Sequence, residues 1–213
     1  KIINAKYLDQ FDGRQGVLRF DGEQSKLECP NYESLRFSGD MSFEMWVRRN
    51  GPVKNGSGML FGDRSNFGFF MGYWHVLSFF YSGFNVQLNA SENMIVPVER
   101  SIISDKWSHI AVVAAYPRIR FYHDGKLIRD AYMPHPGINK RHNVVSWIGG
   151  WKDRSAPIDV DEFRFYRRAL SATEVAAHAR EEIVQAGQEW ELTIEPRWYE
   201  DTIAVRLSCQ GMN

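Results

Sequence analysis

Cysteine is scarce in this sequence: the 213 residues include only Cys29 and Cys209. Two cysteines are too few for a disulfide scaffold, and their spacing matches no metal-binding motif. A long-range bridge and two free thiols are both compatible with the sequence, and we expect free thiols. A chain of this length can bury a full hydrophobic core without disulfides or metals, so the fold must follow from the pattern of apolar side chains.

An excess of charge of one sign and a long apolar run are also absent. The 26 basic and 26 acidic side chains give a formal net charge of zero. This balance argues against nucleic acid as a partner, because phosphate binding requires a basic surface. No stretch approaches the roughly 20 apolar residues of a membrane span. The chain begins at Lys1 without a visible signal peptide, so we expect either a removed leader or a piece of a longer protein.

Motifs of several common enzyme classes are missing as well. The sequence contains no Gly-x-Ser-x-Gly elbow, no phosphate-binding loop and no dinucleotide fingerprint. Its six histidines form no His-x-x-x-His or His-x-His pair, so we do not expect transition-metal binding. These absences favour a binding or structural role over catalysis.

What the sequence does contain is alternation of apolar and polar residues with a period of two. Residues 41–48 alternate in this way, as a half-buried strand does. Other runs with strand character are 17–20, 59–62, 66–73, 76–81, 84–88, 94–98, 107–113, 146–150 and 160–166. Asp124-Gly125 joins two further runs and predicts a type I′ hairpin, since both central residues of that turn need a positive φ. Many short strands without alternating helices predict an all-β fold, an antiparallel β-sandwich or jelly roll.

One helix is expected near the C-terminal end of the chain. Ser171 and Glu174 have the spacing of a capping box, and the helix should run to about Gln185 and stop at Gly187. Residues 190–195 and 202–207 then have the pattern of two strands separated by a loop at 196–201. We therefore assign residues 1–187 to one β-sandwich domain. Residues 188–213 are either the start of a following β module or an extension that packs back on the first domain.

The order of these segments resembles a known family, the laminin G-like (LamG-like) jelly-roll domains. The matching segments are residues 18–22, 27–30 and 42–48 at the opening, 107–113 and 121–128 in the middle, and 148–150, 158–166 and 168–174 at the close. Each piece alone is weakly informative, but the ordered set is specific and covers about residues 5–180. The chain is thereby similar to domains of the concanavalin A-like lectin and glucanase superfamily.

The resemblance implies a binding function. Such domains are usually appended to secreted glycosidases, adhesins and other surface proteins, where they bind carbohydrate or protein, and many hold a structural calcium ion. We therefore expect a non-catalytic, carbohydrate-binding accessory module of a larger secreted or cell-surface protein that acts on glycans. A protein–protein adhesion module and a structural spacer that contacts neighbouring domains of the same chain are the alternatives, because a fold does not fix its ligand.

Asp21 and Asp161 are the candidate ligands for calcium, an ion that prefers six to eight oxygen atoms. Asp21 opens an early turn, and the family resemblance places that turn beside the late strand that contains Asp161. Both carboxylates could then meet one ion, with Asp159 as a weaker third ligand. In the alternative interpretation, Asp21 stabilises its own Asp-Gly turn and Asp161 caps a strand end.

Aromatic side chains, 14% of the chain, are the candidates for stacking on a sugar ring. Trp74, His75 and Tyr81 lie in an aromatic block at residues 67–84, and Trp151 follows a Gly-Gly turn beside mixed charges. The alternative is that the block belongs to the core and that Trp151 lies in a solvated loop.

Laminarinase-type endoglucanases of the same superfamily bear on the question of catalysis. They need paired carboxylates, usually as Glu-x-Asp-x-x-Glu on one strand, because alternate residues of a strand share a face. The nearest stretch has Pro157 in place of the first glutamate, and its Glu162 alternates out of phase with Asp159 and Asp161. We expect no enzymatic activity in these residues, which leaves open an enzyme elsewhere in a longer protein.

Overall fold

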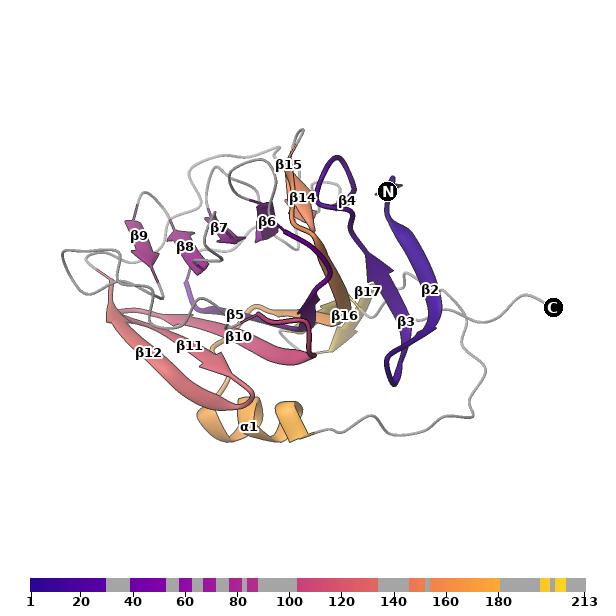
Figure 1. The fold of residues 1–213 in the computed structure, drawn as a ribbon. Helices are drawn as coiled ribbons and strands as arrows, with labels where there is room; N and C mark the ends of the chain where they lie inside the picture. The colour runs from indigo at the N-terminus through magenta and orange to yellow at the C-terminus, as the bar shows by residue number, and fades with distance from the viewer. Residues whose placement is uncertain are drawn as a thin grey trace.

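In the computed structural model, the described part of the chain forms two antiparallel sheets that face each other as a sandwich, with one short helix outside them (Figure 1). This arrangement confirms the predicted fold class. The described residues are 1–29, 39–52, 58–62, 67–71, 77–81, 84–87, 103–133, 146–151, 154–180, 196–199 and 202–205.

The smaller sheet is the upper layer in Figure 1, and its described strands follow the order β1–β4–β13–β6–β7–β8–β9. Their bounds in that order are Ile2–Ile3, Lys26–Cys29, Ser146–Ile148, Gly58–Gly62, Phe67–Met71, Leu77–Tyr81 and Phe84–Gln87. A separate two-stranded ladder pairs β14 (Gly150–Trp151) with β15 (Arg154–Ser155).

The larger sheet follows the order β12–β11–β10–β5–β16–β18–β17, and β3, itself paired with β2, also pairs with β16. The bounds of the seven strands in that order are Lys126–Tyr132, Arg118–His123, Ser108–Ala115, Met41–Arg49, Ile158–Tyr166, Thr202–Val205 and Pro196–Tyr199. The hairpin strands are β2 (Lys6–Phe11) and β3 (Arg14–Arg19). Strand β16 is therefore paired with β5 on one side and with β3 and β18 on the other.

The hydrophobic core lies between the two sheets, and strand β5 gives it one alternate set of its residues. Phe43, Met45 and Val47 of β5 are fully buried in it, as the period-two pattern of residues 41–48 predicts. Phe61 from the smaller sheet packs against Phe43 with ring centroids 5.2 Å apart and against Phe163 at 4.5 Å. Such aromatic pairs contribute about 0.5–1.5 kcal/mol each beyond the area they bury. The other alternate set of β5 is left to face outward.

Two Asp-Gly turns close hairpins of the larger sheet. Asp124 and Gly125 have φ values of 48° and 75°, which confirms the predicted turn with two positive φ angles. A Cβ atom on Gly125 would lie 3.0 Å from the Cα of Ala176, so glycine at this position also allows the helix to approach. Asp12 and Gly13 form an equivalent turn between β2 and β3, with φ values of 50° and 83°. The sequence expectations did not include that second hairpin.

Helix α1 (Ala172–Arg180) lies on the outer face of the larger sheet, below β11 and β12 in Figure 1. The backbone N–H of Ser171 donates to Oε2 of Glu174 (2.8 Å), and the N–H of Glu174 donates to Oγ of Ser171 (3.2 Å). These bonds confirm the predicted capping box. The expected part of the helix beyond residue 180 lies outside the described residues. No described helix is both long and apolar enough to cross a membrane.

Strands β17 and β18 continue the larger sheet, because β18 pairs with the end of β16 through Phe165–Ile203 and Tyr166–Thr202. The prediction of a loop at residues 196–201 was therefore wrong for β17. Pro196 is compatible with this strand because it is the first residue of an edge strand, where its missing N–H leaves no ladder bond unmade. The assignment of residues 188–213 to a module of their own stays a prediction.

Candidate functional site

The outer face of the larger sheet carries polar and charged side chains in rows that run across the strands. On β5, Ser42, Glu44, Trp46 and Arg48 alternate with the core residues. Directly opposed residues of neighbouring antiparallel strands point to the same face. The register of the sheet therefore decides which side chains of distant segments meet on this face.

One of these rows is charged along four strands. Lys6 on β2 opposes Arg19 on β3, Arg19 opposes Asp159 on β16, and Asp159 opposes Arg48 on β5. The row thus places one cation on each side of a carboxylate, Arg19 and Arg48 beside Asp159, with a third cation, Lys6, beyond Arg19. We refer to these four residues as the charged row.

Asp159 is the centre of the charged row and is completely buried. Arg19 donates to it through Nε and Nη2, at 2.7 Å and 2.9 Å, and Asn50 donates through Nδ2 at 2.8 Å. Nε of Arg48 lies 3.6 Å from Oδ2 of Asp159. The hydrogen bond to Asp159 raises the pKa of Arg19, against the effect of burial. The carboxylate is therefore well satisfied, and it fixes the orientation of the Arg19 guanidinium.

The β2–β3 hairpin holds the two arginines from the other side. The guanidinium carbons of Arg19 and Arg48 lie 4.3 Å and 4.7 Å from the ring centroid of Phe11. Arg48 also donates through Nη1 to Asp12 in the turn of the same hairpin. Cation–π contacts of this kind contribute about 0.5–1 kcal/mol each at exposed sites. Both guanidinium groups are thus positioned before any ligand arrives.

A hollow of about 480 Å³ adjoins the charged row. Its lining residues are Asn4, Lys6, Arg19, Phe20, Asp21, Arg48 and Asn50. This volume falls within the roughly 300–1,000 Å³ of small-molecule sites. The side chains of Asn4 and Lys6 form no hydrogen bond or ion pair with any described residue. They are therefore available to a ligand.

The fixed polar groups of the hollow include both donors and acceptors. Asn50 uses both hydrogens of Nδ2, toward the carbonyl of Phe20 (3.0 Å) and toward Asp159, which leaves its Oδ1 as an acceptor. Arg19 keeps Nη1 as a donor, because Asp159 engages only Nε and Nη2. A group that both donates and accepts, such as a hydroxyl, matches this combination.

Asp21 supplies a second acceptor, and its structure matches the turn-stabilising alternative. Its Oδ1 accepts from the backbone N–H groups of Glu23, Gln24 and Ser25 at 2.8–3.2 Å, and from Oγ of Ser25 at 2.6 Å. Burial acts to raise the pKa of Asp21, but these hydrogen bonds outweigh it and hold the pKa below its usual value. The ionised Asp21 lines the hollow, and its Oδ2 accepts no hydrogen bond from a described residue.

The structure does not bring Asp21 and Asp161 together, contrary to the arrangement expected for a shared calcium ion. The turn of Asp21 does lie beside the start of β16, since a Cβ on Gly22 would contact Pro157. Asp161 follows Pro157 by four residues. At ~3.3 Å per strand residue, Asp161 lies about 13 Å from the turn that contains Asp21. Asp161 instead accepts a hydrogen bond from Nη1 of the buried Arg14.

The remaining donor set does not fit a single ion either. Asp159, the expected third ligand, is engaged by Arg19 and Asn50. Among the described residues, no group of three or more His, Cys, Asp or Glu side chains could hold a metal ion. Calcium binding stays a prediction, and a site shared by Asp21 and Asp161 has no support in this geometry.

The predicted sugar-stacking residues are not part of the hollow as described. Trp74 and His75 lie outside the described residues. Tyr81 is the last residue of β8, where its backbone pairs with Phe67 and Phe84, and its side chain is outside the description. Trp151 is partly buried in β14 and pairs with Arg154 rather than lying in a loop. The role of all four residues in stacking stays a prediction.

The next row of the outer face is filled by its own side chains. Asp161 opposes Trp46, and Trp46 opposes His109. The guanidinium carbon of Arg14 lies 4.1 Å from the Trp46 ring centroid and 5.3 Å from that of Trp107. Because Arg14 covers the aromatic surface and pairs with Asp161, this row offers no stacking platform.

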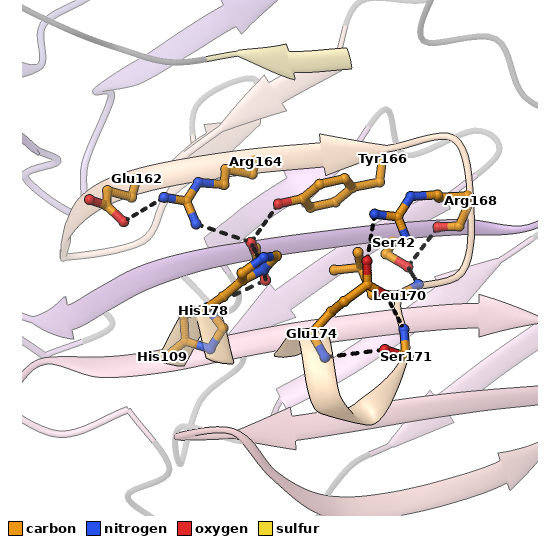
Figure 2. Close-up of polar contacts among 11 residues, drawn as sticks. Ser42, His109, Glu162, Arg164, Tyr166, Arg168, Leu170, Ser171, Glu174 and His178 are labelled. Carbon is orange, nitrogen blue, oxygen red and sulfur yellow. Dashed lines mark hydrogen bonds and ion pairs between the residues drawn. The ribbon is translucent and has the colours of Figure 1, made fainter. Parts of the chain in front are cut away.

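A buried cluster around Glu44 lies further along the same face, under helix α1. Glu44 accepts from the hydroxyl of Tyr166 (2.7 Å), and Nδ1 of His178 lies 2.8 Å from its Oε1. Nη1 of Arg164 and Nε2 of His109 lie 3.4 Å and 3.5 Å from its oxygens. In Figure 2 the dashed lines from Arg164, Tyr166 and His178 converge on one carboxylate between sheet and helix.

The electrostatics of this cluster indicate a helix anchor rather than a ligand site. Burial acts to raise the pKa of Glu44, but hydrogen bonds from His109, His178 and Tyr166 outweigh it and hold the pKa far below the usual range. Only 1% of the Glu44 side chain is exposed, so no ligand can reach it while α1 is docked. Ser42 fixes the start of the helix, because its Oγ accepts from the N–H of Leu170 (2.9 Å) (Figure 2).

Sequence reasoning missed most of the hollow, namely Asn4, Lys6, Arg19, Arg48 and Asn50. One signal was present, because Asp12-Gly13 is the same dipeptide that predicted the Asp124-Gly125 hairpin. That turn would have aligned Lys6 with Arg19. The registers of β3 with β16 and of β16 with β5 have no comparable signal in the sequence.

Fold and site together define a β-sandwich domain with a polar hollow on the outer face of its larger sheet. A family model described as the concanavalin A-like lectin/glucanases superfamily matches residues 21–176. The chain belongs to this superfamily, which confirms the resemblance seen in the sequence. No curated protein matches the sequence.

Solved structures share the fold at low sequence identity. The receptor binding domain of botulinum neurotoxin mosaic serotype C/D aligns with a TM-score of 0.65 and 8% identity, over 86% of this chain and 46% of that one. The binding domain of Paraclostridial Mosquitocidal Protein 1 aligns with a TM-score of 0.63 and 16% identity, over 84% and 46%. Domain 4 of AbnA, a GH43 extracellular arabinanase from Geobacillus stearothermophilus, aligns with a TM-score of 0.58 and 18% identity, over 83% and 82%.

These likenesses show the fold alone. The chain spans 46% of the length of the two toxin binding domains. The structure of AbnA domain 4 was determined in complex with arabinotriose, and another botulinum binding domain, of neurotoxin DC, was determined in complex with rat synaptotagmin II.

Proposed function

We propose that this chain is a non-catalytic carbohydrate-binding module that uses the hollow beside the charged row. The observation that carries the proposal is a hollow of about 480 Å³ in which oriented donors and acceptors stand beside two unengaged polar side chains, Asn4 and Lys6. Sugar hydroxyls both donate and accept hydrogen bonds. Sugar binding costs the least side-chain entropy when the protein groups are already held in place. Asp159 and Phe11 hold Arg19 in this way.

The partners of Asp159 and Asp161, two of the three acidic residues on β16, support a non-catalytic role. A glycosidase needs one carboxyl group as acid and a second as nucleophile or base, both facing the substrate. Asp159 is completely buried and engaged by Arg19. Asp161 is engaged by Arg14, and both arginines hold their carboxylates away from solvent. The pair is therefore accounted for by ion pairing within the sheet.

The structural neighbours support the same class of function and a location outside the cytoplasm. Domain 4 of AbnA belongs to an extracellular enzyme, and its structure was determined in complex with a sugar, arabinotriose. Two further neighbours are the receptor binding domain of a botulinum neurotoxin and the binding domain of a mosquitocidal protein. On this basis the chain serves as an accessory module of a larger secreted or surface protein that acts on glycans.

A glycan array, probed with and without calcium, tests the proposal. We expect binding to a defined set of oligosaccharides, and we expect the Asn4→Gly/Lys6→Ala variant to lose at least five-fold in affinity. Glycine at position 4 removes the carboxamide while retaining the positive φ of 51°. Absence of binding across plant, animal and microbial glycans would overturn the proposal. Binding that this variant leaves unchanged would move the site away from the hollow.

A second candidate function, protein adhesion, is favoured by a different surface. Leu127, Ile128 and Tyr132 on the edge strand β12 are exposed by 51%, 42% and 57%. Exposed apolar side chains on an unpaired edge are a common feature of protein interfaces. Protein adhesion would be favoured if the wild type bound a protein partner and a Leu127→Ser/Ile128→Ser variant did not.

A further inference from the structure

We propose that the sugar recognised by the hollow is acidic, with a carboxylate bound between Lys6 and Arg19. This inference rests on the proposed carbohydrate-binding function and names the ligand class of the same site. It follows from the charges that line the hollow and from how each of them is already engaged.

Cationic side chains outnumber anionic side chains in the lining of the hollow. Its lining includes three cationic side chains, Lys6, Arg19 and Arg48, and one anionic side chain, Asp21. Two further carboxylates lie nearby, but Asp159 is buried beneath the arginines and Asp12 is paired with Arg48. Once Arg19 and Arg48 are paired with these carboxylates, Lys6 is the lining cation without a described anionic partner, while the N–H groups of its own turn stabilise the charge of Asp21.

Lys6 and Arg19 lie directly opposite each other in the β2–β3 ladder. Like charges placed opposite each other on one sheet face destabilise the pair. Asp159 compensates Arg19, whereas Lys6 has no described anionic partner. A ligand carboxylate between the two side chains would relieve this repulsion.

The Arg19 guanidinium uses only part of its donors within the protein. Its Nε and Nη2 edge is occupied by Asp159. A guanidinium carries five N–H donors in a planar fork, so the Nη1 and Nη2 end of Arg19 still has donors to offer. Such a fork binds a carboxylate in bidentate fashion. Because Asp159 and Phe11 hold the group, the fork is oriented in advance.

The remaining groups favour a sugar over a simple anion. Oδ1 of Asn50 and Oδ2 of Asp21 are acceptors, and an acceptor in the hollow requires a donor on the ligand. Hydroxyl groups of a sugar supply such donors, while a fully ionised inorganic anion does not. The ionised Asp21 repels any negative charge of the ligand that lies beside it. The ligand carboxylate is therefore expected near Lys6 and away from Asp21.

The test compares each acidic oligosaccharide with its carboxyl-reduced neutral form. Tetragalacturonate and tetraglucuronate are titrated against the full chain by calorimetry, beside the reduced tetrasaccharides, at low and high salt. We expect at least ten-fold tighter binding of an acidic form, with an advantage that shrinks as salt screens the charges. Lys6→Gln should remove at least five-fold of the acidic affinity and a smaller part of the neutral affinity, so that the advantage of the acidic form shrinks. Lys126→Gln, an exposed lysine in the β11–β12 hairpin, is the matched control.

The outcomes separate the two proposals. Equal affinity for acidic and neutral forms would overturn the acidic ligand and leave carbohydrate binding intact. Binding of neither acidic nor neutral forms would overturn the acidic ligand, and the glycan array then decides whether carbohydrate binding itself stands. An equal loss of acidic affinity in Lys6→Gln and Lys126→Gln would show a general charge effect and would also overturn it.

Discussion

Replacing Glu44 by glutamine should destabilise the domain far more than the same change at Glu162. Both carboxylates contact Arg164, at 3.4 Å for Glu44 and 3.1 Å for Glu162. The Glu44 side chain is 1% exposed, whereas that of Glu162 is 41% exposed. The two variants thus change the same chemical group beside the same arginine in opposite solvent environments.

The magnitude follows from the partners that each carboxylate holds. Glu44 accepts one strong bond from Tyr166 and one from His178, and a hydrogen bond to a charged group is worth about 1.5–3 kcal/mol. Breaking a buried ion pair costs about 3–5 kcal/mol. Glutamine keeps the shape and one acceptor, so we expect a loss of about 3 kcal/mol for Glu44→Gln. A surface pair such as Glu162 with Arg164 is worth at most about 1 kcal/mol.

Urea unfolding at pH 7, followed by circular dichroism, measures both variants. Hydrogen exchange at residues 172–180 should show that Glu44→Gln frees helix α1 before the sheet unfolds, because His178 links the helix to Glu44. A double-mutant cycle of Glu44→Gln with His178→Ala isolates that link. If Glu44→Gln and Glu162→Gln proved equally stable, the helix-anchor interpretation of the cluster would be refuted.

Three further predictions concern a turn, a cap and an ion. Gly125→Ala should cost about 1–2 kcal/mol in urea unfolding, because alanine is strained at positive φ and its Cβ would press on Ala176; an unchanged midpoint would contradict this. The hydrogen bond from Arg168 lowers the pKa of Glu174 from 4.5 to about 2. The stability that this pair contributes is therefore present above about pH 4.5 and lost as the pH falls toward 2. Glu174→Gln should lower the free energy of unfolding by roughly 0.5 kcal/mol at neutral pH and leave it unchanged at pH 2. If unfolding curves showed the same difference between wild type and variant at both pH values, the Glu174–Arg168 pair would not be its cause. Asp21→Ala should leave calcium stoichiometry unchanged in calorimetry, since Asp21 is engaged by its own turn, whereas loss of a bound ion would restore Asp21 as a ligand.

Much of the fold could be predicted because its determinants are local. Alternation at residues 41–48, the Asp124-Gly125 turn and the Ser171–Glu174 capping box each depend on residues that are neighbours in the sequence. Strand β17 was missed because residues 196–201 were expected to separate two strands, whereas an edge strand tolerates a proline such as Pro196 at its first residue.

The candidate site was less predictable because its determinants are distant in the sequence. Asp159 meets Arg19 and Arg48 only through two strand registers, and nothing local specifies either register. Asp161 was expected to face an ion, but the buried Arg14 from the β2–β3 hairpin occupies its carboxylate. Composition identifies the charged residues, whereas the pairing of the sheet decides which of them stand together.

The most direct test of the central claim is an NMR titration of the isotope-labelled chain with the oligosaccharide that the array selects. The account predicts that chemical-shift changes centre on Asn4, Lys6 and Asn50, including the side-chain amides of both asparagines. Changes confined to strands β7–β9, with the signals of these three residues unmoved, would contradict it.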